Sequence, residues 1–280
     1  MRFTKFIAAL FLLTASQAFG QKPVLNLSKG QKITITTTTK ASSSAQVMGQ
    51  DIENKIDASA TQVADVTDVK TEGVELNLLN SHILVSVQSM GQEMGYDSDK
   101  KDNEGPMAEV FGKYVNAPVN LTVNSEGTII KKETKISEES AGGPSMGGFQ
   151  DQLSALGCIK SRILGRDLSA GLTWQDSATT VKGKLTIKDD GNFTVVTIEN
   201  GMASLTYEGT SITSGVVEQM GQEMEFAGQS KVSTKLVIDL KTGIVLIENT
   251  SSTINAAVNA GGMEIPVTGS NTYTMNAKLN

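Results

Sequence analysis

Methionine pairs are the residues in this sequence whose type and spacing first suggest chemistry. Met90–Met94 (MGQEM) recurs unchanged as Met220–Met224, with looser copies at Met48–Ile52 and Gly261–Ile265. Two thioethers can ligate Cu(I), but a turn inside the motif would place the sulfurs on opposite strands, and no histidine supports them. A flexible apolar rim for a ligand is more plausible, and packing of each Met on its own sheet end is the simplest interpretation. The candidate rim residues are Met48, Met90, Met94, Met220, Met224 and Met263.

The other reactive residues form no recognisable catalytic or metal site. His82 is the only histidine and Cys158 the only cysteine, so zinc and the common nucleophilic mechanisms lack partners. The loop Asp97–Gly105 (DSDKKDNEG) carries oxygen ligands suited to Ca²⁺, but it fails the EF-hand pattern, and a solvated loop is the simpler interpretation. We therefore predict no enzyme activity, no catalytic residues, no metal site and no cofactor.

The first twenty residues have the composition of a targeting segment. Arg2 and Lys5 precede the apolar run Phe6–Leu13, and Ala18–Gly20 fits the small-x-small rule for signal peptidase. The run is too short to cross a bilayer, and no cysteine stands at the cleavage point to carry a lipid. We expect residues 1–20 to be a signal peptide. The product would be exported to the periplasm or the extracellular medium without a lipid anchor.

Charge and composition restrict the classes of partner. Removing Arg2 and Lys5 with the leader changes the net charge from −6 to −8, whereas nucleic acids and anionic membranes need clustered Lys and Arg. Aromatic residues make up 5% of the chain, too few for the girdles of an outer-membrane barrel. We expect that the protein binds no nucleic acid and that it is not itself an integral membrane protein. A lipid or other apolar ligand and an envelope protein remain as candidate partners.

Alternating sequences predict the strands that must position these groups. Gln31–Lys40 and Lys231–Leu240 both alternate with period two and are rich in β-branched residues. Residues 106–115 and Phe149–Leu164 have the apolar spacing of short helices. Asp189–Asn192 (DDGN) is a strong hairpin signal, because Asp-Gly suits the primed turns.

The Met-Gly turns recur at matching intervals in the two halves of the chain. Met48 and Met90 are 42 residues apart, and Met220 and Met263 are 43 apart. This spacing predicts a duplicated four-stranded meander, in which the first and third turns lie at the same end. The Met-bearing turns of each half would thus share a rim. A change of phase near Asn80 predicts a bulge in the third strand.

These patterns predict a mainly β fold. Long antiparallel strands would form two related meanders that make a curved half-barrel or a sandwich, with two short helices between the halves. The expected divisions are residues 21–136 for the first meander with its short helix near 106–115, 137–165 for a flexible loop and helix, and 166–280 for the second meander.

Seven short motifs, in their order, carry a resemblance to a known family. They are Leu27–Gln31, Met48–Gln50, Tyr96–Ser98, Gly105–Met107, Val119–Gly127, Gly171–Trp174 and Asp239–Gly243. With them, the chain resembles a family of uncharacterised exported proteins from Gram-negative bacteria, to which no activity is attached. In architecture, the long meanders and short helices are similar to the curved half-barrels of periplasmic lipoprotein and lipid carriers.

Binding is the leading functional hypothesis. An apolar or amphiphilic ligand would lie in the concave face of a curved sheet, with the helices as plug or lid. The alternative is a structural or surface-interaction protein with a filled core and no small-molecule ligand. A pocket of several hundred Å³ lined by Val, Ile, Leu and Met would favour binding, and interdigitated inner faces would favour the alternative.

Overall fold

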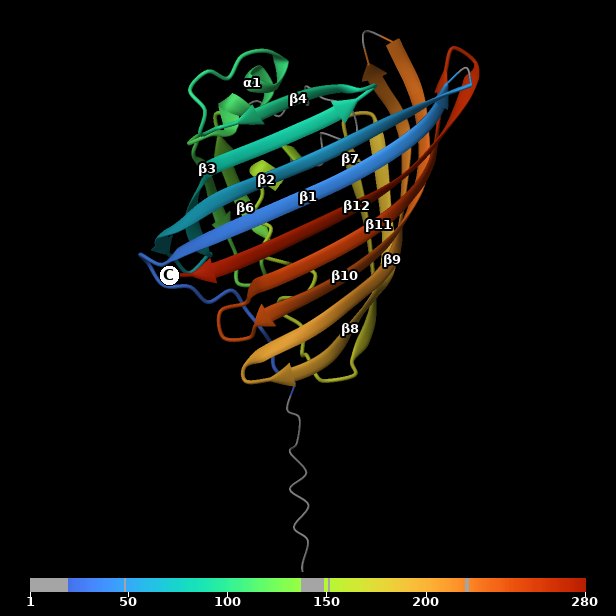
Figure 1. Cartoon of the computed structure of the whole chain (residues 1–280). Helices are drawn as coiled ribbons and strands as arrows, with labels where there is room; N and C mark the ends of the chain where they lie inside the picture. The colour runs from blue at the N-terminus through green and yellow to red at the C-terminus, as the bar shows by residue number, and fades with distance from the viewer. Residues whose placement is uncertain (1–19, 48, 137–148, 151, 220–221) are drawn as a thin grey trace, which may run out of the picture.

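The alternating sequences form one antiparallel sheet of twelve strands (Figure 1), in a computed structural model that describes residues 20–47, 49–136, 149–150, 152–219 and 222–280. The first six strands are β1 (Lys32–Val47), β2 (Gln50–Val69), β3 (Val74–Ser89), β4 (Gln92–Asp97), β5 (Val119–Val123) and β6 (Ile129–Thr134). The second six are β7 (Thr173–Lys182), β8 (Leu185–Glu199), β9 (Met202–Gln219), β10 (Gln222–Asp239), β11 (Ile244–Ala260) and β12 (Met263–Leu279). The prediction of a mainly β, antiparallel protein is confirmed.

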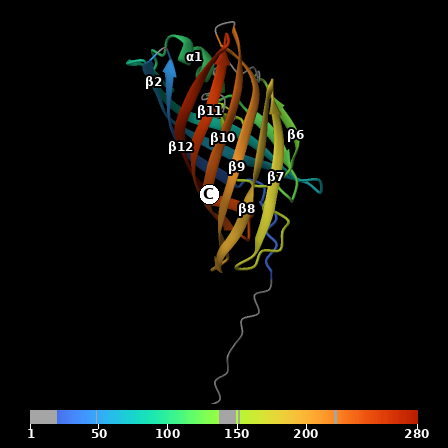
Figure 2. The ribbon, with the colours of Figure 1, turned by 90° about the vertical axis from the view of Figure 1, so that its right-hand side faces the viewer.

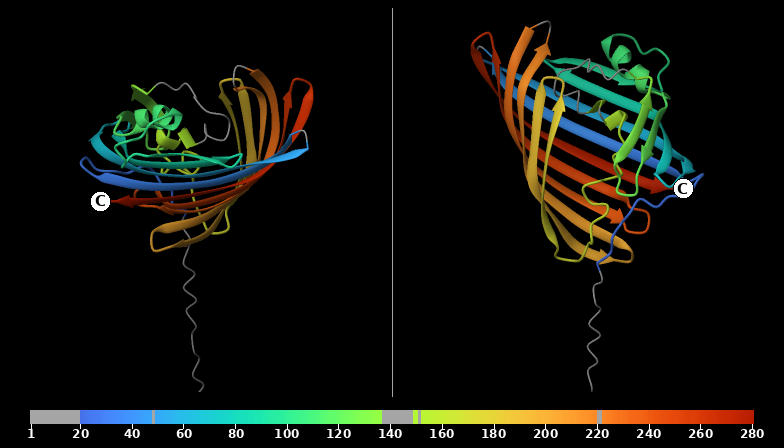
Figure 3. Two further views of the ribbon diagram at one scale, coloured as in Figure 1. Left: turned by 45° about the horizontal axis from the view of Figure 1, so that its top comes forward. Right: turned by 180° about the vertical axis from the view of Figure 1, so that it is seen from behind.

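The two predicted meanders are joined through the first and last strands of the chain. The strand order is β6-β5-β3-β2-β1-β12-β11-β10-β9-β8-β7, and β4 pairs with β3 outside this path. β1 runs antiparallel to β12 from the Ile33–Leu279 pair to the Ala45–Val267 pair. The strands from β7 to β12 form one side of a strongly curved sheet (Figure 2), and the whole sheet makes a trough (Figure 3). Of the two predicted shapes, the half-barrel is the one found.

Strand alternation decides which side chains face the inside of the trough. On β1, Ile33 and Ile35 are fully buried, whereas Lys40 is exposed. On β10, Ile238 is buried and Lys235 is exposed. Because successive side chains of a strand point to opposite faces, the apolar set of β1 and of β10 lines the concave face and their lysines face solvent.

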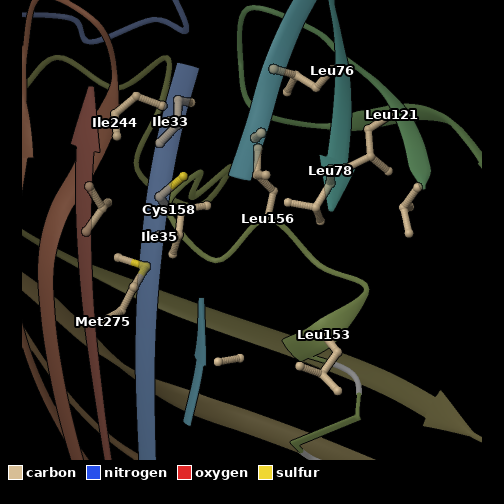
Figure 4. Close-up of a cluster of buried hydrophobic side chains, with 14 of the residues drawn as sticks. Ile33, Ile35, Leu76, Leu78, Leu121, Leu153, Leu156, Cys158, Ile244 and Met275 are labelled. Atoms are coloured by element: carbon tan, nitrogen blue, oxygen red, sulfur yellow. The ribbon is translucent and has the colours of Figure 1, made fainter. Parts of the chain in front are cut away.

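Segments that lie between the two meanders in the sequence fill part of the trough. The helix α1 (Pro106–Phe111) and the 3-10 turn η1 (Gly112–Tyr114) lie on its concave side (Figure 3), which confirms the helix predicted near 106–115. Residues 152–168 follow across β1 and β12. Figure 4 shows buried side chains from β1, β3, β5, β11, β12 and this crossing segment: Ile33, Ile35, Leu76, Leu78, Leu121, Leu153, Leu156, Cys158, Ile244 and Met275.

The second predicted helix, Phe149–Leu164, is wrong beyond its first turn. Residues 149–150 and 152–153 are helical, and turns and irregular backbone follow from Ser154 onward. The backbone here is tied to the sheet instead, since the Cys158 carbonyl accepts a hydrogen bond of 2.8 Å from the Val245 amide. The apolar spacing still predicted burial, because every member of the proposed stripe is buried: Phe149, Leu153, Leu156 and Ile163.

The hairpin predicted at Asp189–Asn192 is also wrong. β8 runs straight through these residues, and the turns on either side of it contain Gly183 and Gly201, both at positive φ. Gly191 instead pairs with Gly209 of β9, and the ring of Tyr207 lies against both. A Cβ at either glycine would come within 2.7 Å of the Tyr207 Cζ atom. The Asp-Gly pair therefore makes room for an aromatic ring, and not for a turn.

The bulge predicted near Asn80 is confirmed. The β2–β3 register shifts between Thr61 and Gln62, so that Thr61 pairs with His82 and Gln62 with Asn80. Both amides are buried. The Gln62 Nε2 donates to the Asn80 Oδ1 at 3.0 Å, and the Asn80 Nδ2 donates to the carbonyl of Leu153 at 2.8 Å. This pair of amides fastens the crossing segment to the sheet.

Candidate functional site

The strand ends that flank the four Met-Gly motifs of the sequence lie at one rim of the trough. The register places the β1–β2 connection beside the β11–β12 turn, because Ala45 pairs with Val267. The β3–β4 turn lies on the same side, because Asn54 near the start of β2 pairs with Ser89. The β9–β10 connection also belongs there, since β10 and β11 pair near Asn259. These strand ends lie toward the upper right of Figure 1. We call this end of the strands the Met rim.

The methionines of the Met rim differ in exposure. Met90 is 73% exposed and adopts a positive φ of 49° in its turn. Met94 and Met263 are exposed, and Met224 is half-buried. Met48 and Met220 lie outside the described residues. The rim thus presents apolar, flexible side chains to solvent, and whether they contact a ligand stays a prediction.

Next to the Met rim, the concave face of β10–β12 is only partly covered by the residues that the structure describes. Its inward-facing apolar side chains are only half-buried, and they define what we call the open region: Phe226, Val232, Ile254, Val258, Ile265 and Val267. Farther from the rim, the same strands bury Leu236, Ile238 and Met275 almost completely. The change from half-buried to buried occurs along single strands, so it reflects what lies above the sheet.

A hollow of about 340 Å³ lies at the deep end of the open region. Phe193, Tyr207 and Val232 contribute to its floor from three neighbouring strands, and Arg162 and Ile163 of the crossing segment line it from the other side. The volume fits the expectation for a binding site, but the lining is mixed and contains no methionine. A second, wider hollow of about 490 Å³ lies at the rim itself, around Gly215 and Phe226.

An aromatic row crosses the sheet at this hollow. The rings of Trp174 and Phe193 stack with their centroids 5.1 Å apart, and those of Phe193 and Tyr207 lie 4.8 Å apart. Burial, and secondarily the charge of Asp189, raises the pKa of the Tyr207 phenol. Tyr207 therefore keeps its proton over the physiological range and can donate a hydrogen bond to a polar group in the hollow.

Two ion pairs and an array of hydroxyls surround the same hollow. The Lys160 Nζ lies 2.7 Å from the Glu248 Oε2, whose side chain is 9% exposed. The Arg162 guanidinium lies 3.1 Å from Asp176 and 3.5 Å from Asp189. The hydroxyls of Thr234 on β10 and Thr250 on β11, which lie 2.8 Å apart, complete the polar lining. The deep end of the open region is thus polar and charged, whereas its rim end is apolar.

The sequence alone could point to only a few of the residues that line this hollow. The sequence pattern predicts a turn at Asp189, and this is wrong because strand β8 continues through that residue. Lys160 and Glu248 gave no signal, because their pairing depends on where an irregular segment crosses the sheet. Cys158 is buried, and burial raises the pKa of its thiol to about 12.

No protein-family model matches the sequence, and no curated protein matches it. Among solved structures, lipovitellin, studied for its lipid–protein interactions, is similar over 91% of this chain with a TM-score of 0.52 and 9% identity. The match spans 26% of the lipovitellin chain, and at this identity it concerns the fold alone. An outer membrane channel from Pseudomonas putida F1 aligns over 91% of this chain and 97% of its own, with a TM-score of only 0.25 and 9% identity. In the described part of the chain, no helix is long and apolar enough to cross a membrane.

Proposed function

We propose that the protein is an exported, non-enzymatic binding protein whose open region holds an amphiphilic ligand. The observation that carries the proposal is the continuity of two surfaces. The half-buried apolar side chains of the open region run directly into the hollow that Tyr207, Arg162 and the threonines line. Ligand sites are typically concave and mainly apolar with a few polar groups that fix orientation.

Each end of the open region would act on a different part of the ligand. An apolar chain lying over Val232, Ile254 and Val258 would remove half-exposed aliphatic surface from water, at about 25 cal/mol per Å² buried. A polar group at the deep end would accept hydrogen bonds from Tyr207 and from threonine hydroxyls. The apolar end of the ligand would then point toward the Met rim.

Three further observations are consistent with this role but do not by themselves indicate a ligand. The fold likeness to lipovitellin is an analogy between folds. Export rests on the leader sequence of residues 1–20, and the absence of enzyme activity rests on the missing catalytic residue combinations.

Filling the open region with a bulky side chain tests the proposal. Val232→Trp would project an indole into the hollow, and we expect it to weaken the binding of the fluorescent apolar probe N-phenyl-1-naphthylamine at least about fivefold. Lys231→Trp is the matched control, because Lys231 is the exposed neighbour on the opposite face of the same strand. Native mass spectrometry of the exported protein would show in parallel whether a lipid co-purifies.

The alternative, a structural or surface-interaction protein with a filled core, is favoured by the other part of the trough. There, Leu78, Phe111 and Leu153 belong to one apolar cluster and are only 0 to 1% exposed. If the wild-type protein neither binds the probe nor carries a lipid, or if both tryptophan variants bind the probe like the wild type, the alternative should replace the binding proposal.

A further inference from the structure

His82 lies beside two aspartates on the outer face of the sheet, away from the open region. Its Nε2 is 3.8 Å from the Asp97 Oδ1 and 3.4 Å from the Asp99 Oδ2. The ligand atoms of these three residues all lie within 4.8 Å of one another. The sequence had shown no partner for His82, and this was wrong. Asp97 is the last residue of the neighbouring strand β4, Asp99 lies in the loop that follows it, and both meet His82 only through strand pairing.

The fold explains this meeting. The bulge at Asn80 inserts one residue into β3, after which Ile83 faces the core and His82 faces outward. β4 returns alongside β3 and pairs Leu84 with Asp97. Beyond that pair, the Ser98 amide donates to the Ile83 carbonyl at 2.9 Å, so the loop stays next to His82 as it leaves the sheet.

Hydrogen bonds hold the two aspartates in place. The Asn103 Nδ2 donates to the Asp97 carbonyl at 2.6 Å and to the Lys100 carbonyl at 2.7 Å. The Asp99 amide donates to the Asp97 Oδ1 at 3.0 Å. A loop fixed in this way loses little conformational freedom when a ligand binds, which favours affinity.

We propose that His82, Asp97 and Asp99 bind a first-row divalent cation, with Zn²⁺ as the preferred ion. Imidazole nitrogen suits Zn²⁺ and its neighbours, whereas Ca²⁺ and Mg²⁺ prefer oxygen ligands alone. The observed spacings of 3.4 and 3.8 Å are close to the roughly 3.3 Å between ligands that lie about 2.0–2.1 Å from a tetrahedral Zn²⁺. Three protein ligands would leave a fourth position for water or for a donor from a partner.

The surroundings set the expected strength of the site. The side chains of His82 and Asp97 are 32% and 24% exposed, and that of Asp99 is 73% exposed. The Lys100 Nζ lies 3.9 Å from the Asp97 Oδ2 and would have to move aside for a cation. Partial exposure and a competing ammonium group favour binding in the micromolar range over the tight binding of closed structural zinc sites.

The single histidine allows a direct test, because its imidazole signals in a ¹H–¹⁵N NMR spectrum need no assignment. The full-length exported protein, prepared without a polyhistidine tag and freed of metal, would be titrated with ZnCl₂ while the nitrogen resonances and the heat of binding are followed. We expect the Nε2 resonance to shift with one equivalent of Zn²⁺. Asp99→Asn should weaken binding at least about tenfold, and His82→Gln should abolish the tight phase in calorimetry.

Asp102→Asn is the matched control, because it removes the same charge from the same loop outside the cluster. Circular dichroism would confirm that the variants are folded, and the exposure of Asp99 makes its substitution structurally mild. An unshifted imidazole resonance would overturn the proposal, since His82 and the aspartates would then form only an ordinary ion pair. Equal weakening by Asp102→Asn, or displacement of Zn²⁺ by equimolar Ca²⁺, would overturn it as well.

Discussion

Two parts of the same concave face differ first in the segments that pack against them. The packed region, around Ile33, Leu78 and Met275, is covered by α1 and by residues 149–168. The open region, around Val232 and Ile254, has the same strand alternation and apolar inward-facing side chains but stays half-exposed. Alternation therefore determines which side of a strand faces inward, and the connecting segments determine whether that side becomes core.

The floor of the open region also differs in composition from that of the packed region. Small residues alternate with its apolar side chains at inward-facing positions, among them Gly209, Gly228, Ser252 and Gly269. The Phe226 ring lies against Gly228, with ring carbons 3.2 Å from the place where a Cβ would stand. Small residues reduce the apolar area that stays in contact with water, so this part of the sheet can remain uncovered at a modest cost in free energy.

The largest predicted effect compares one truncation in each region. Leu78→Ala should lower the free energy of unfolding by about 2–5 kcal/mol, because Leu78 is 0% exposed and its removal leaves a cavity. Ile254→Ala should cost about 1 kcal/mol or less, because Ile254 is already in contact with water. Urea denaturation of both variants would measure this. Equal losses would mean that the open region is as well packed as the core.

A smaller loss of stability is expected where the crossing segment is attached to the sheet by hydrogen bonds. Asn80→Ala removes donors to the carbonyls of Leu153 and Tyr114, at 2.8 and 3.2 Å, in a site that is fully buried. Leaving such carbonyls unpaired costs about 1–3 kcal/mol. Hydrogen exchange should then increase first in residues 152–168. Asn77→Ala is the control, because Asn77 bonds to Asn120 on the outer face; a similar loss there would contradict the role given to Asn80.

Sequence patterns predicted the strands, the inward-facing residues and the bulge at Asn80, because these depend on neighbours in the same strand. The Met-Gly turns were predicted to share a rim within each half, and the register extends this to both halves. Pairing of β1 with β12 could not be predicted, since it joins residues from opposite ends of the chain.

The candidate sites were harder to predict than the strands. The Lys160–Glu248 pair and the His82–Asp97–Asp99 cluster each join residues from different elements, so no local spacing reveals them. Gly191 shows a different limit. Its Asp-Gly motif is a valid turn signal, and the Tyr207 ring on the next strand outweighs it.

The buried thiol of Cys158 should make the stability of the packed region depend on pH. Burial raises the pKa of its thiol from an ordinary value of 9.0 to about 12 in the folded protein. The unfolded chain releases this proton at lower pH than the folded chain, so the stabilisation is fully present below about pH 9 and is lost as the pH rises toward 12. At about pH 10 the loss should be about 1 kcal/mol, and Cys158→Ala should remove this part of the alkaline decline.

The same thiol chemistry distinguishes the two regions kinetically. Cys158 is the only cysteine and is fully buried, so it should react with Ellman's reagent at pH 8 only as fast as the packed region opens. A cysteine introduced by Ser252→Cys, in a Cys158→Ala background, would lie on the floor of the open region and should react at least about 100-fold faster, because its sulfur is reached without unfolding. Comparable rates would show either that the packed region opens readily or that the open region is covered in solution. Adding a ligand that protects the introduced cysteine but leaves the reaction of Cys158 unchanged would place that ligand in the open region.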